Sequence, residues 1–187
     1  MTTGTVSDRQ QTEKEMVERA QEHPAAFRNI YEAHFKDVFR FVYNRVGEAE
    51  LAKDITQTVF VKALQALPRY QYRGAPILSW LYRIALNECL DFFRKSKKSR
   101  EVVLDQEQAE ALYEELIGIS QREEWLEKLP DILSQLKPDE VTFLELRFFE
   151  SRSFKEVAAI QGMTETNAKI KTYRILERVR KLFETRS

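Results

Sequence analysis

The chain has 187 residues, a length that suits one domain or two small ones. Hydrophobic residues make up 43% of it and charged residues 32%, which is too apolar for a disordered chain, and no apolar run is long enough to predict insertion into a membrane. Lys and Arg equal Asp and Glu in number, 30 against 30, so only the distribution of charge can indicate a partner.

The amino-terminal stretch MTTGTVSDRQQTEKE lacks the basic and then apolar pattern of a secretory signal. Cys89 is the only cysteine, so no internal disulfide can form. We therefore expect a cytoplasmic protein.

Charge is segregated along the chain. A basic block at 94–100 precedes an acidic stretch at 101–128, and the residues from Lys169 onward are basic again. This distribution predicts two basic lobes joined by an acidic tether, which can bind an anion although the net charge is zero.

Apolar residues recur at intervals of three and four from Phe27 to Val46, and Gly47 follows them. This is the period of a helix that buries one face, so we predict a long helix over about 25–46 that stops at the glycine. The segment EAELAKDITQTVFVKALQALP predicts a second amphipathic helix that ends at Pro68. Its inward residues are predicted to be Leu51, Ile55, Val59 and Leu64. Another of its faces carries Asp54, Gln57, Thr58 and Lys62.

Pro68, Gly74 and Pro76 predict a loop over 68–77, after which the helical period returns. The apolar stripe of this next helix consists of Leu78, Leu81, Ala85, Cys89 and Phe92. A neighbouring face carries Trp80, Arg83, Asn87, Asp91, Arg94 and Lys98.

The helical pattern weakens over 97–120, which we interpret as a linker, although Leu112, Tyr113 and Leu116 could form a short amphipathic turn against a partner. Helical signals return at Ser120, which has a capping-box spacing to Glu123. Another helix is predicted to start near Pro138, because Pro138, Asp139 and Glu140 supply the proline and the acids typical of a first turn.

The segment SFKEVAAIQGMTETNAKIKTYRILERVRKLF predicts a helix-turn-helix. Ser153 and Glu156 form a capping box, Gly162 breaks the first helix, and Thr164 can cap a longer second one. The predicted fold class is therefore all-α, with two small helical domains joined by an acidic flexible linker. The predicted ranges are 1–98 for the first domain, 99–120 for the linker and 121–187 for the second domain.

The second helix of this motif is predicted to carry an outward cationic stripe. The stripe consists of Asn167, Lys171, Arg174, Arg178 and Lys181, and the buried stripe of Ala168, Thr172, Ile175, Val179 and Leu182. A different explanation is equally open for three of the cations near the end of the helix. Arg178, Arg180 and Lys181 could be there because cations interact favourably with the negative end of the helix dipole.

That explanation fits Lys169 and Lys171 poorly, because they lie in the first half of the helix, where the dipole disfavours cations. Thr164, Thr166 and Asn167 beside them can bond bases or phosphates. The pattern therefore favours DNA binding at this point.

Tyr70, Tyr72 and Trp80 precede the basic block that contains Arg94 and Lys95. Aromatic rings gain most where bases are unstacked, about 1–3 kcal/mol per stacked base, and an amide bonded to an extruded base could offset much of the extrusion energy. The combination predicts opened DNA captured without ATP, although Trp80 taken alone fits a core residue under a loop.

Nothing in the sequence predicts catalysis, a cofactor or a metal site. His23 and His34 lie at unrelated places, Cys89 has no evident metal-ligand neighbours, and the five glycines form no phosphate loop. Asp54 with Glu50 is typical of a solvated pair of acids.

Three stretches in order resemble bacterial RNA polymerase sigma factors of the extracytoplasmic-function type, group 4 of the sigma-70 family. They are DITQTVFVKAL at 54–64, SWLYRIALNECLDFFRK at 79–95 and SFKEVAAIQGMTETNAKIKTYR at 153–174. The resemblance covers roughly 25–98 and 121–184. It implies sigma domains two and four in a subunit that binds core polymerase and directs promoter recognition, DNA melting and transcription initiation without being an enzyme.

The resemblance also implies roles for residues in the first domain. The helix matching 54–64 would dock on the clamp helices of the largest polymerase subunit, with Thr58 standing where the family usually has an acid. The loop and helix matching 68–98 would capture a flipped non-template base of the minus-ten element. The expected polymerase-binding residues are Asp54, Gln57, Thr58 and Lys62, and the expected minus-ten residues are Tyr70, Tyr72, Trp80, Arg83, Asn87, Asp91, Arg94, Lys95 and Lys98.

The second domain matches the one that reads the minus-thirty-five element as duplex DNA. The expected residues are Thr164, Thr166, Asn167, Lys169, Lys171, Arg174 and Arg178. The stretch ETNAKIKTYR departs from the family's Gly-Thr-Val, basic residue, Ser or Thr, and Arg. Lysine at 171 favours phosphate anchoring over base reading, so promoter choice is expected to depend on domain two or on a second DNA-bound recruiter.

The linker matches one threaded through the RNA exit path, where its acids could imitate RNA. Many such factors are held inactive by an anti-sigma factor, and apolar linker residues could serve that contact. Two alternatives stay open: a helix-turn-helix transcriptional regulator that binds duplex DNA without polymerase, and a helical adaptor that binds only protein.

Overall fold

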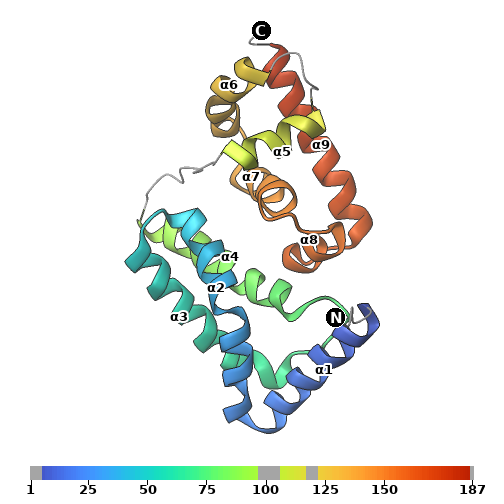
Figure 1. The fold of residues 1–187 in the computed structure, drawn as a ribbon. Helices are drawn as coiled ribbons and strands as arrows, with labels where there is room; N and C mark the ends of the chain where they lie inside the picture. Colours follow the sequence, from blue (N-terminus) through green and yellow to red (C-terminus); the bar gives the residue numbers. More distant parts are fainter. Residues whose placement is uncertain (1–5, 97–105, 117–121, 186–187) are drawn as a thin grey trace. The chain divides into compact units, whose positions relative to one another are not determined.

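The computed structural model describes residues 6–96, 106–116 and 122–185, and in these ranges every regular element is a helix. The chain divides into two compact units, residues 1–101 and 102–187 (Figure 1). The all-α fold class predicted from the sequence is confirmed.

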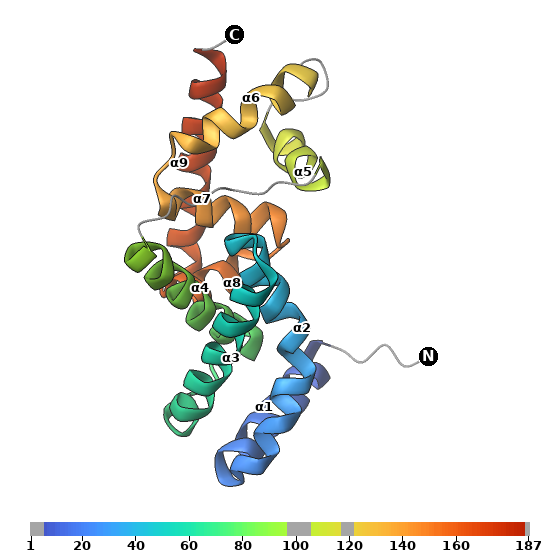
Figure 2. The ribbon, with the colours of Figure 1, turned by 90° about the vertical axis from the view of Figure 1, so that its left-hand side faces the viewer.

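The first unit is a bundle of helices. It contains α1 (Val6–Glu22), the short turn η1 (Pro24–Ala26), α2 (Phe27–Val46), α3 (Ala49–Ala66), the short turn η2 (Leu67–Arg69) and α4 (Ile77–Ser96). Helices α2, α3 and α4 pack against one another in all three pairs, and α1 packs against α2 (Figures 1 and 2). Their core consists of fully buried apolar side chains, among them Ile30, Val38, Val59, Leu81 and Ala85.

Helix α2 confirms the long helix expected over 25–46. It begins at Phe27, directly after the short turn opened by Pro24. Gly47 ends it in the left-handed conformation, with φ of 72°, and the Gly47 N–H donates to the Tyr43 carbonyl at 2.9 Å. A residue with a Cβ would be strained at this φ, which explains why the helix stops at a glycine.

Helix α3 departs from the predicted core at two positions, because Leu51 is only half-buried and Leu64 is exposed. Leu64 is 42% exposed, whereas Ala63 is fully buried and takes the inward place that the sequence analysis gave to Leu64. Leu64 follows the buried Val59 by five residues, which is a rotation of about 140° around the helix, while Ala63 follows it by four and stays on the same face. The prediction that Leu64 faces inward was therefore wrong.

Helix α1 is not among the elements predicted from the sequence. Among the side chains of α1 from Gln10 onward, which the structure describes, only Val17 and Ala20 are fully buried apolar ones, so the helical period is weak. They are nevertheless enough to seat α1 on α2, and α1 also reaches the short turns η1 and η2.

The second unit contains the predicted helix-turn-helix. Its elements are α5 (Gln106–Leu116), α6 (Arg122–Ser134), α7 (Pro138–Leu144), the π-helical turn η4 (Glu145–Phe149), α8 (Phe154–Gln161) and α9 (Glu165–Glu184). Helices α8 and α9 form the motif, and Gly162 between them has a φ of 70°. The Ser153 hydroxyl accepts from the Glu156 N–H at 3.2 Å, and the Glu156 carboxylate accepts from the Ser153 N–H at 2.9 Å, which confirms the capping box.

The start expected at Pro138 is also confirmed. Pro138 occupies the first turn of α7, where a missing N–H does no harm, and the Glu140 carboxylate accepts from the Lys137 N–H at 2.8 Å. The capping box expected at Ser120 lies outside the described residues.

Helix α5 lies inside the range expected to be a linker, and it packs within the second unit. Its inner face is buried and consists of Ala109, Leu112, Tyr113 and Leu116. The Trp125 indole N–H donates to the Ala109 carbonyl at 3.4 Å, and the Arg180 guanidinium donates to the Leu116 carbonyl at 2.9 Å. The amphipathic turn anticipated at 112–116 is therefore part of a longer helix whose apolar face is covered by its own chain.

Replacing Leu112 with alanine should destabilise the second unit by about 2–5 kcal/mol, because it would leave a cavity under α5. Glu114→Ala, an exposed substitution on the same helix, should change stability by less than about 0.5 kcal/mol. The chain has two tryptophans, so in a Trp80→Phe background the fluorescence of Trp125 reports urea unfolding of the second unit alone. An equal, small effect of both substitutions would mean that α5 is only a tether.

Candidate polymerase and nucleic-acid interfaces

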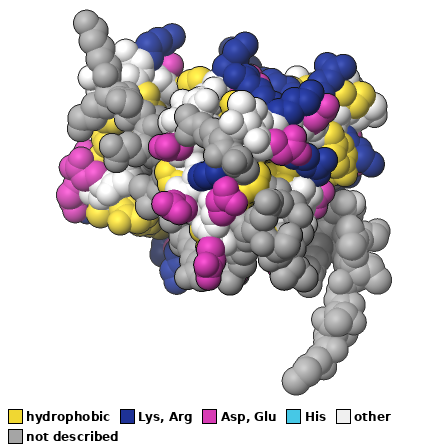
Figure 3. Space-filling view, turned by 90° about the horizontal axis from the view of Figure 1, so that it is seen from above, with side chains coloured by type: hydrophobic (Ala, Val, Ile, Leu, Met, Phe, Trp, Pro, Cys, Tyr) yellow, Lys and Arg dark blue, Asp and Glu magenta, His cyan; other side chains and the backbone are white. Residues whose placement is uncertain are grey.

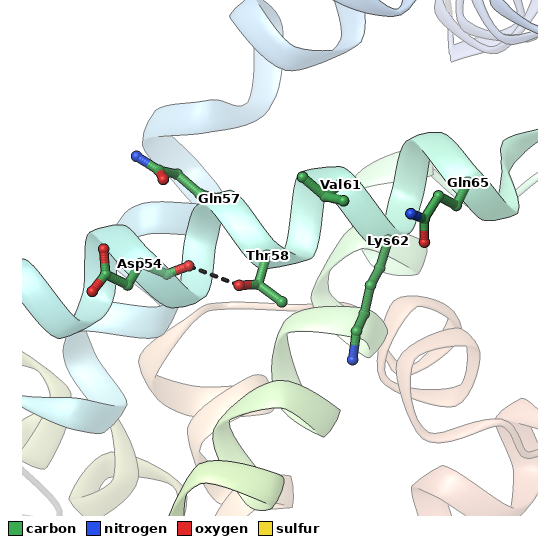
Figure 4. A pocket seen from close by; sticks show the side chains of 6 residues that line it. All are labelled: Asp54, Gln57, Thr58, Val61, Lys62 and Gln65. Carbon is green, nitrogen blue, oxygen red and sulfur yellow. Dashed lines mark hydrogen bonds between the residues drawn. The ribbon is translucent and has the colours of Figure 1, made fainter.

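Helix α3 presents the four residues expected to bind polymerase on one exposed face. Asp54, Gln57, Thr58 and Lys62 line a hollow of about 500 Å³ together with Val61 and Gln65 (Figure 4). Val61 is 55% exposed, although it is apolar, and the sequence analysis missed it. Its spacing of three and four from Thr58 and Gln57 was the available signal.

Two of these side chains also have partners within the first unit. The Thr58 hydroxyl donates to the Asp54 carbonyl at 3.0 Å, a bond that turns it back onto its own helix (Figure 4). The Lys62 ammonium pairs with the Glu88 carboxylate of α4 at 2.5 Å. Asp54 and Gln57 are exposed on the same face.

The loop before α4 brings two of the predicted aromatic residues together. The rings of Tyr70 and Trp80 have centroids 4.5 Å apart and planes inclined by 37°. Both side chains are half-buried. The pKa of Tyr70 is raised to about 12, mainly by burial and to a lesser extent by the nearby Glu13 and Tyr72. The Trp80 ring therefore packs partly on its neighbour and keeps part of its surface open.

The amino-terminal helix α1 holds this loop from both ends. The Gln21 amide donates to the Leu67 carbonyl at 2.9 Å and to the Tyr70 carbonyl at 2.7 Å. The Tyr72 hydroxyl donates to Glu13 Oε2 at 3.2 Å, and the Ile77 N–H donates to Glu13 Oε1 at 3.1 Å. Burial raises the pKa of the Glu13 carboxyl, and these two hydrogen bonds oppose that rise.

Helix α4 carries its polar residues on one outward face. Arg83, Asn87, Arg94 and Lys95 are exposed, and Asp91 is half-buried and pairs with Arg94 at 2.9 Å. Lys98 lies outside the described residues. The buried stripe includes Leu81, Ala85 and Cys89 as expected, whereas Leu78 and Phe92 are only half-buried.

Exposed cations in the loop were missed by the sequence analysis. Arg69 and Arg73 are both exposed and flank Tyr70 and Tyr72. They appear in the segment PRYQYRG, where each tyrosine has an arginine as its neighbour, so the signal was present in the sequence. The loop therefore carries positive charge in addition to α4.

On α9, the residues of the first turns point outward. The Thr164 hydroxyl accepts from the Asn167 N–H at 3.3 Å and caps the helix, as predicted. Thr166, Asn167, Lys169 and Arg174 are exposed. The second exposed set lies beside them and is apolar: Ile170 is 46% and Tyr173 48% exposed.

Lys171 and Arg178 differ from their neighbours because α7 engages them. The Lys171 ammonium lies 3.0 Å from Asp139 Oδ2 and 4.5 Å from the centroid of the Phe143 ring. The Arg178 guanidinium donates to both carboxylate oxygens of Glu140, at 3.0 and 2.8 Å, and to the Gln135 carbonyl at 3.3 Å. A specific carboxylate on another helix, and not only the helix dipole, therefore accounts for the position of Arg178.

The inner face of α9 largely follows the prediction. Ala168, Thr172, Ile175 and Val179 are buried as expected. Leu182 is only half-buried, and Phe183 is buried in its place, with its ring centroid 5.5 Å from that of Trp125. The helix turns by about 100° per residue, so its buried stripe drifts by the fourth turn.

In the view of Figure 3, many of the Lys and Arg side chains gather toward one edge, and Asp and Glu side chains lie scattered among apolar and uncharged ones. Among the residues that the structure describes, no helix is long and apolar enough to cross a membrane. In the same ranges no three His, Cys, Asp or Glu side chains are grouped so that they could hold a metal ion.

Two features define the class of the protein. One unit contains a helix-turn-helix whose second helix is capped by Thr164 and exposes amide and cationic side chains. The other places an aromatic pair ahead of a helix that exposes Asn87, Arg83 and Arg94. Together they are typical of a two-lobed DNA-binding protein.

Comparisons with known proteins give the family. The model for sigma-70 region 2 matches residues 30–99, and the model for sigma-70 region 4 matches residues 126–179. The chain is 32% identical over 174 residues to the ECF RNA polymerase sigma factor BldN of Streptomyces coelicolor, covering 90% of this chain and 64% of that protein. It is 31% identical over 147 residues to the RNA polymerase sigma factor SigV of Bacillus subtilis, covering 79% of this chain and 84% of that protein. The chain belongs to the extracytoplasmic-function (ECF) sigma factors of bacterial RNA polymerase, which act in promoter recognition at transcription initiation.

A solved structure shows the same fold. The structure of CnrH in complex with the cytosolic domain of CnrY matches with a TM-score of 0.57 and 18% identity, covering 94% of this chain and 99% of that one. At this identity the likeness concerns the fold alone.

The pair between Asp139 and Lys171 predicts a pH dependence of stability. Burial alone would raise the pKa of the Asp139 carboxyl, but the hydrogen bond and charge of Lys171 and two backbone N–H groups hold it below its ordinary value of 3.8. Because the folded-state pKa is the lower one, the pair stabilises the second unit above the ordinary value and loses this effect as pH falls through the folded-state pKa.

Asp139→Asn should therefore destabilise the second unit at neutral pH, by up to about 1 kcal/mol for so exposed a pair, and the difference from wild type should disappear in acid. Urea unfolding followed by Trp125 fluorescence at a series of pH values measures it. Glu127→Gln, at an exposed acid of α6, serves as the control. A difference that stays constant down to the most acid point would contradict the assignment.

Proposed function

We propose that the chain binds core RNA polymerase through the exposed face of α3, opens promoter DNA with the loop at 67–77 and α4, and holds upstream duplex DNA with the first half of α9. It acts in the cytoplasm as a specificity subunit, without catalytic chemistry, cofactor or metal of its own. The first unit corresponds to sigma domain two and the second to sigma domain four.

The observation that carries the proposal is the outward face of the loop and α4. The half-buried pair of Tyr70 and Trp80 offers an aromatic surface, and Asn87 lies two turns farther along the helix, roughly 10 Å from Trp80 along the axis. An asparagine amide offers a donor and an acceptor, as the edge of an extruded base requires. Exposed Arg83 and Arg94 lie on the same helix and suit the phosphates of the captured strand.

Polymerase binding is assigned to α3 because its exposed face combines polar groups with an apolar one. Asp54 and Gln57 are exposed next to Val61, a combination that suits packing against a partner helix. Lys62 is assigned a lesser part, because its pair with Glu88 would have to open before it bound a partner. The family match to region 2, which includes α3, supports this assignment.

Duplex binding is assigned to a smaller set of residues than the sequence suggested. Lys169 and Arg174 are exposed and suit phosphates, while Lys171 is held by Asp139 and Phe143 of α7. Asn167 and Thr166 suit base edges or phosphates near the helix start, and the exposed Ile170 suits the methyl group of thymine.

Partner proteins are part of the proposal in a restricted form. An anti-sigma factor that used the apolar residues of 112–116 would have to displace α5, because Leu112, Tyr113 and Leu116 are buried against their own unit. A second DNA-bound protein that recruits the factor would compensate for weak reading by α9. The first partner would restrain the activity of the chain on polymerase and the second would support it, and neither would replace it.

Lys169→Ala should weaken duplex binding and reduce the slope of log affinity against log salt concentration by about 0.9, as expected for the loss of one phosphate contact. Lys171→Ala should leave that slope nearly unchanged, because its ammonium is engaged by α7. Titrating fluorescent upstream promoter duplex with the purified chain at several salt concentrations measures both. Equal effects of the two substitutions would show that Lys171 leaves α7 to contact DNA.

Asn87→Ala should slow promoter opening about tenfold or more, because it removes hydrogen bonds to a desolvated base. Its affinity for core polymerase should not change. Opening is measured with fluorescent bases in the non-template strand, using purified core polymerase. Asn29→Ala, at an exposed asparagine of α2, is the matched control and should behave as wild type.

The same experiment separates the alternatives. Duplex binding without any affinity for core polymerase would indicate a helix-turn-helix regulator. Failure to bind either DNA or polymerase would indicate a protein-only adaptor. Opening that depends on the chain but not on Asn87 would place the base pocket elsewhere.

A further inference from the structure

Helix α1 reaches the loop at 67–77 through two polar side chains. Glu13 and Gln21 lie eight residues apart, which is roughly 12 Å along the helix. Gln21 bonds the Leu67 and Tyr70 carbonyls at the start of the loop, and Glu13 bonds the Tyr72 hydroxyl in its middle and the Ile77 N–H at its end. These contacts therefore fix both ends of the segment that precedes α4.

The bond to Ile77 has a second effect, because Ile77 is the first residue of α4. The first N–H groups of a helix have no acceptor within the helix, and the preceding Pro76 has no side-chain acceptor to offer. The Glu13 carboxylate supplies an acceptor from another helix, next to the positive end of the helix dipole. Glu13 thus stabilises the start of the helix that carries Trp80 and Asn87.

The loop itself has little regular structure to hold it in place. Between η2 and α4 it is irregular, and Gly74 has a φ of 73°. Each residue of such a segment loses conformational freedom when it is fixed. A loop that is already fixed in the free protein loses less when it binds a partner, which favours affinity and speed of capture.

We propose that α1 is a clamp that positions the base-capturing loop, with Glu13 and Gln21 as its positioning residues. The proposal rests on the proposed function, since it assigns the loop to the capture of an extruded base. It predicts that the clamp acts on promoter opening and not on polymerase binding, because α3 presents its exposed face without any bond to Glu13 or Gln21 among those described.

The alternative is that Glu13 and Gln21 merely attach α1 to the unit. The buried Val17 and Ala20 already seat α1 against its neighbours, so removing either polar side chain should leave the helix in place. The two explanations therefore differ in what the substitutions change. Loss of attachment would lower stability as a whole, whereas loss of the clamp would loosen the loop and slow opening.

Glu13→Ala and Gln21→Ala are the test variants, measured in the full chain. Glu18→Ala is the matched control, because Glu18 is an exposed acid of the same helix, 3.6 Å from Lys14. Glu13→Gln tests rescue, since its amide keeps an oxygen that can accept from Ile77. The readouts are hydrogen exchange of the Ile77 amide, thermal unfolding, affinity for core polymerase, and the rate of promoter opening with fluorescent non-template bases.

For Glu13→Ala we expect Ile77 exchange to become about tenfold faster and promoter opening about tenfold slower, as for loss of a charge-assisted hydrogen bond. Polymerase affinity should match that of Glu18→Ala, and the unfolding temperature should fall only slightly below that of Glu18→Ala, by the amount that loss of this one bond costs. Glu13→Gln should recover most of both rates. Gln21→Ala should slow opening in the same direction.

Unchanged Ile77 exchange in Glu13→Ala would overturn the clamp. Faster exchange with unchanged opening, while Asn87→Ala still slows opening, would overturn the claim that the clamp serves capture. If the wild type opened no promoter, the proposed function would fail and with it the capture role, whereas the exchange data would still decide whether Glu13 holds the loop.

Discussion

A helix leaves its first backbone N–H groups without acceptors of its own, and this chain meets that constraint with side chains at the helices we assign to DNA. Ser153 and Thr164 do so locally for α8 and α9, since each lies directly before the helix that it caps. Glu13 does so for α4 from a different helix, 64 residues away in the chain. The starting points of these helices are therefore fixed, and the side chains that they present keep a fixed place relative to the core of their own unit.

Side chains of a neighbouring helix also explain why the cations on one face of α9 are not equivalent. Lys169 and Arg174 are exposed, whereas Lys171 and Arg178 are held by the acids at the start of α7. Those acids stabilise α7 through its dipole and at the same time bind α9. Spacing along α9 alone would assign Lys171 and Arg178 to DNA binding. In the structure their ion pairs with α7 stabilise the helix-turn-helix instead.

The sequence predicted those elements whose signals are local. Helix α2 with its stop at Gly47, and the helix-turn-helix with its caps, follow from periodicity and from residues adjacent in the chain. Helix α1 was missed because few of its apolar residues are buried, and because its polar contacts reach the distant loop, which no pattern within α1 indicates. The exposed face of α4 was predicted by spacing, but the engagement of Lys171 depends on Asp139, which is distant in sequence and becomes a neighbour only through folding.

Helix α5 affects where the chain can be divided when one of its domains is exchanged for another, whether during evolution or in the laboratory. Its buried face belongs to the second unit, and its carbonyls accept from Trp125 and Arg180 of that unit. A chimera joined at residue 121 would separate α5 from the residues that it covers and expose their apolar surface to solvent. A junction placed before Gln106 would transfer a DNA-binding module together with the helix that completes its core. The smallest segment of this half that can be transferred with its core intact is therefore larger than the helix-turn-helix and begins in the acidic stretch.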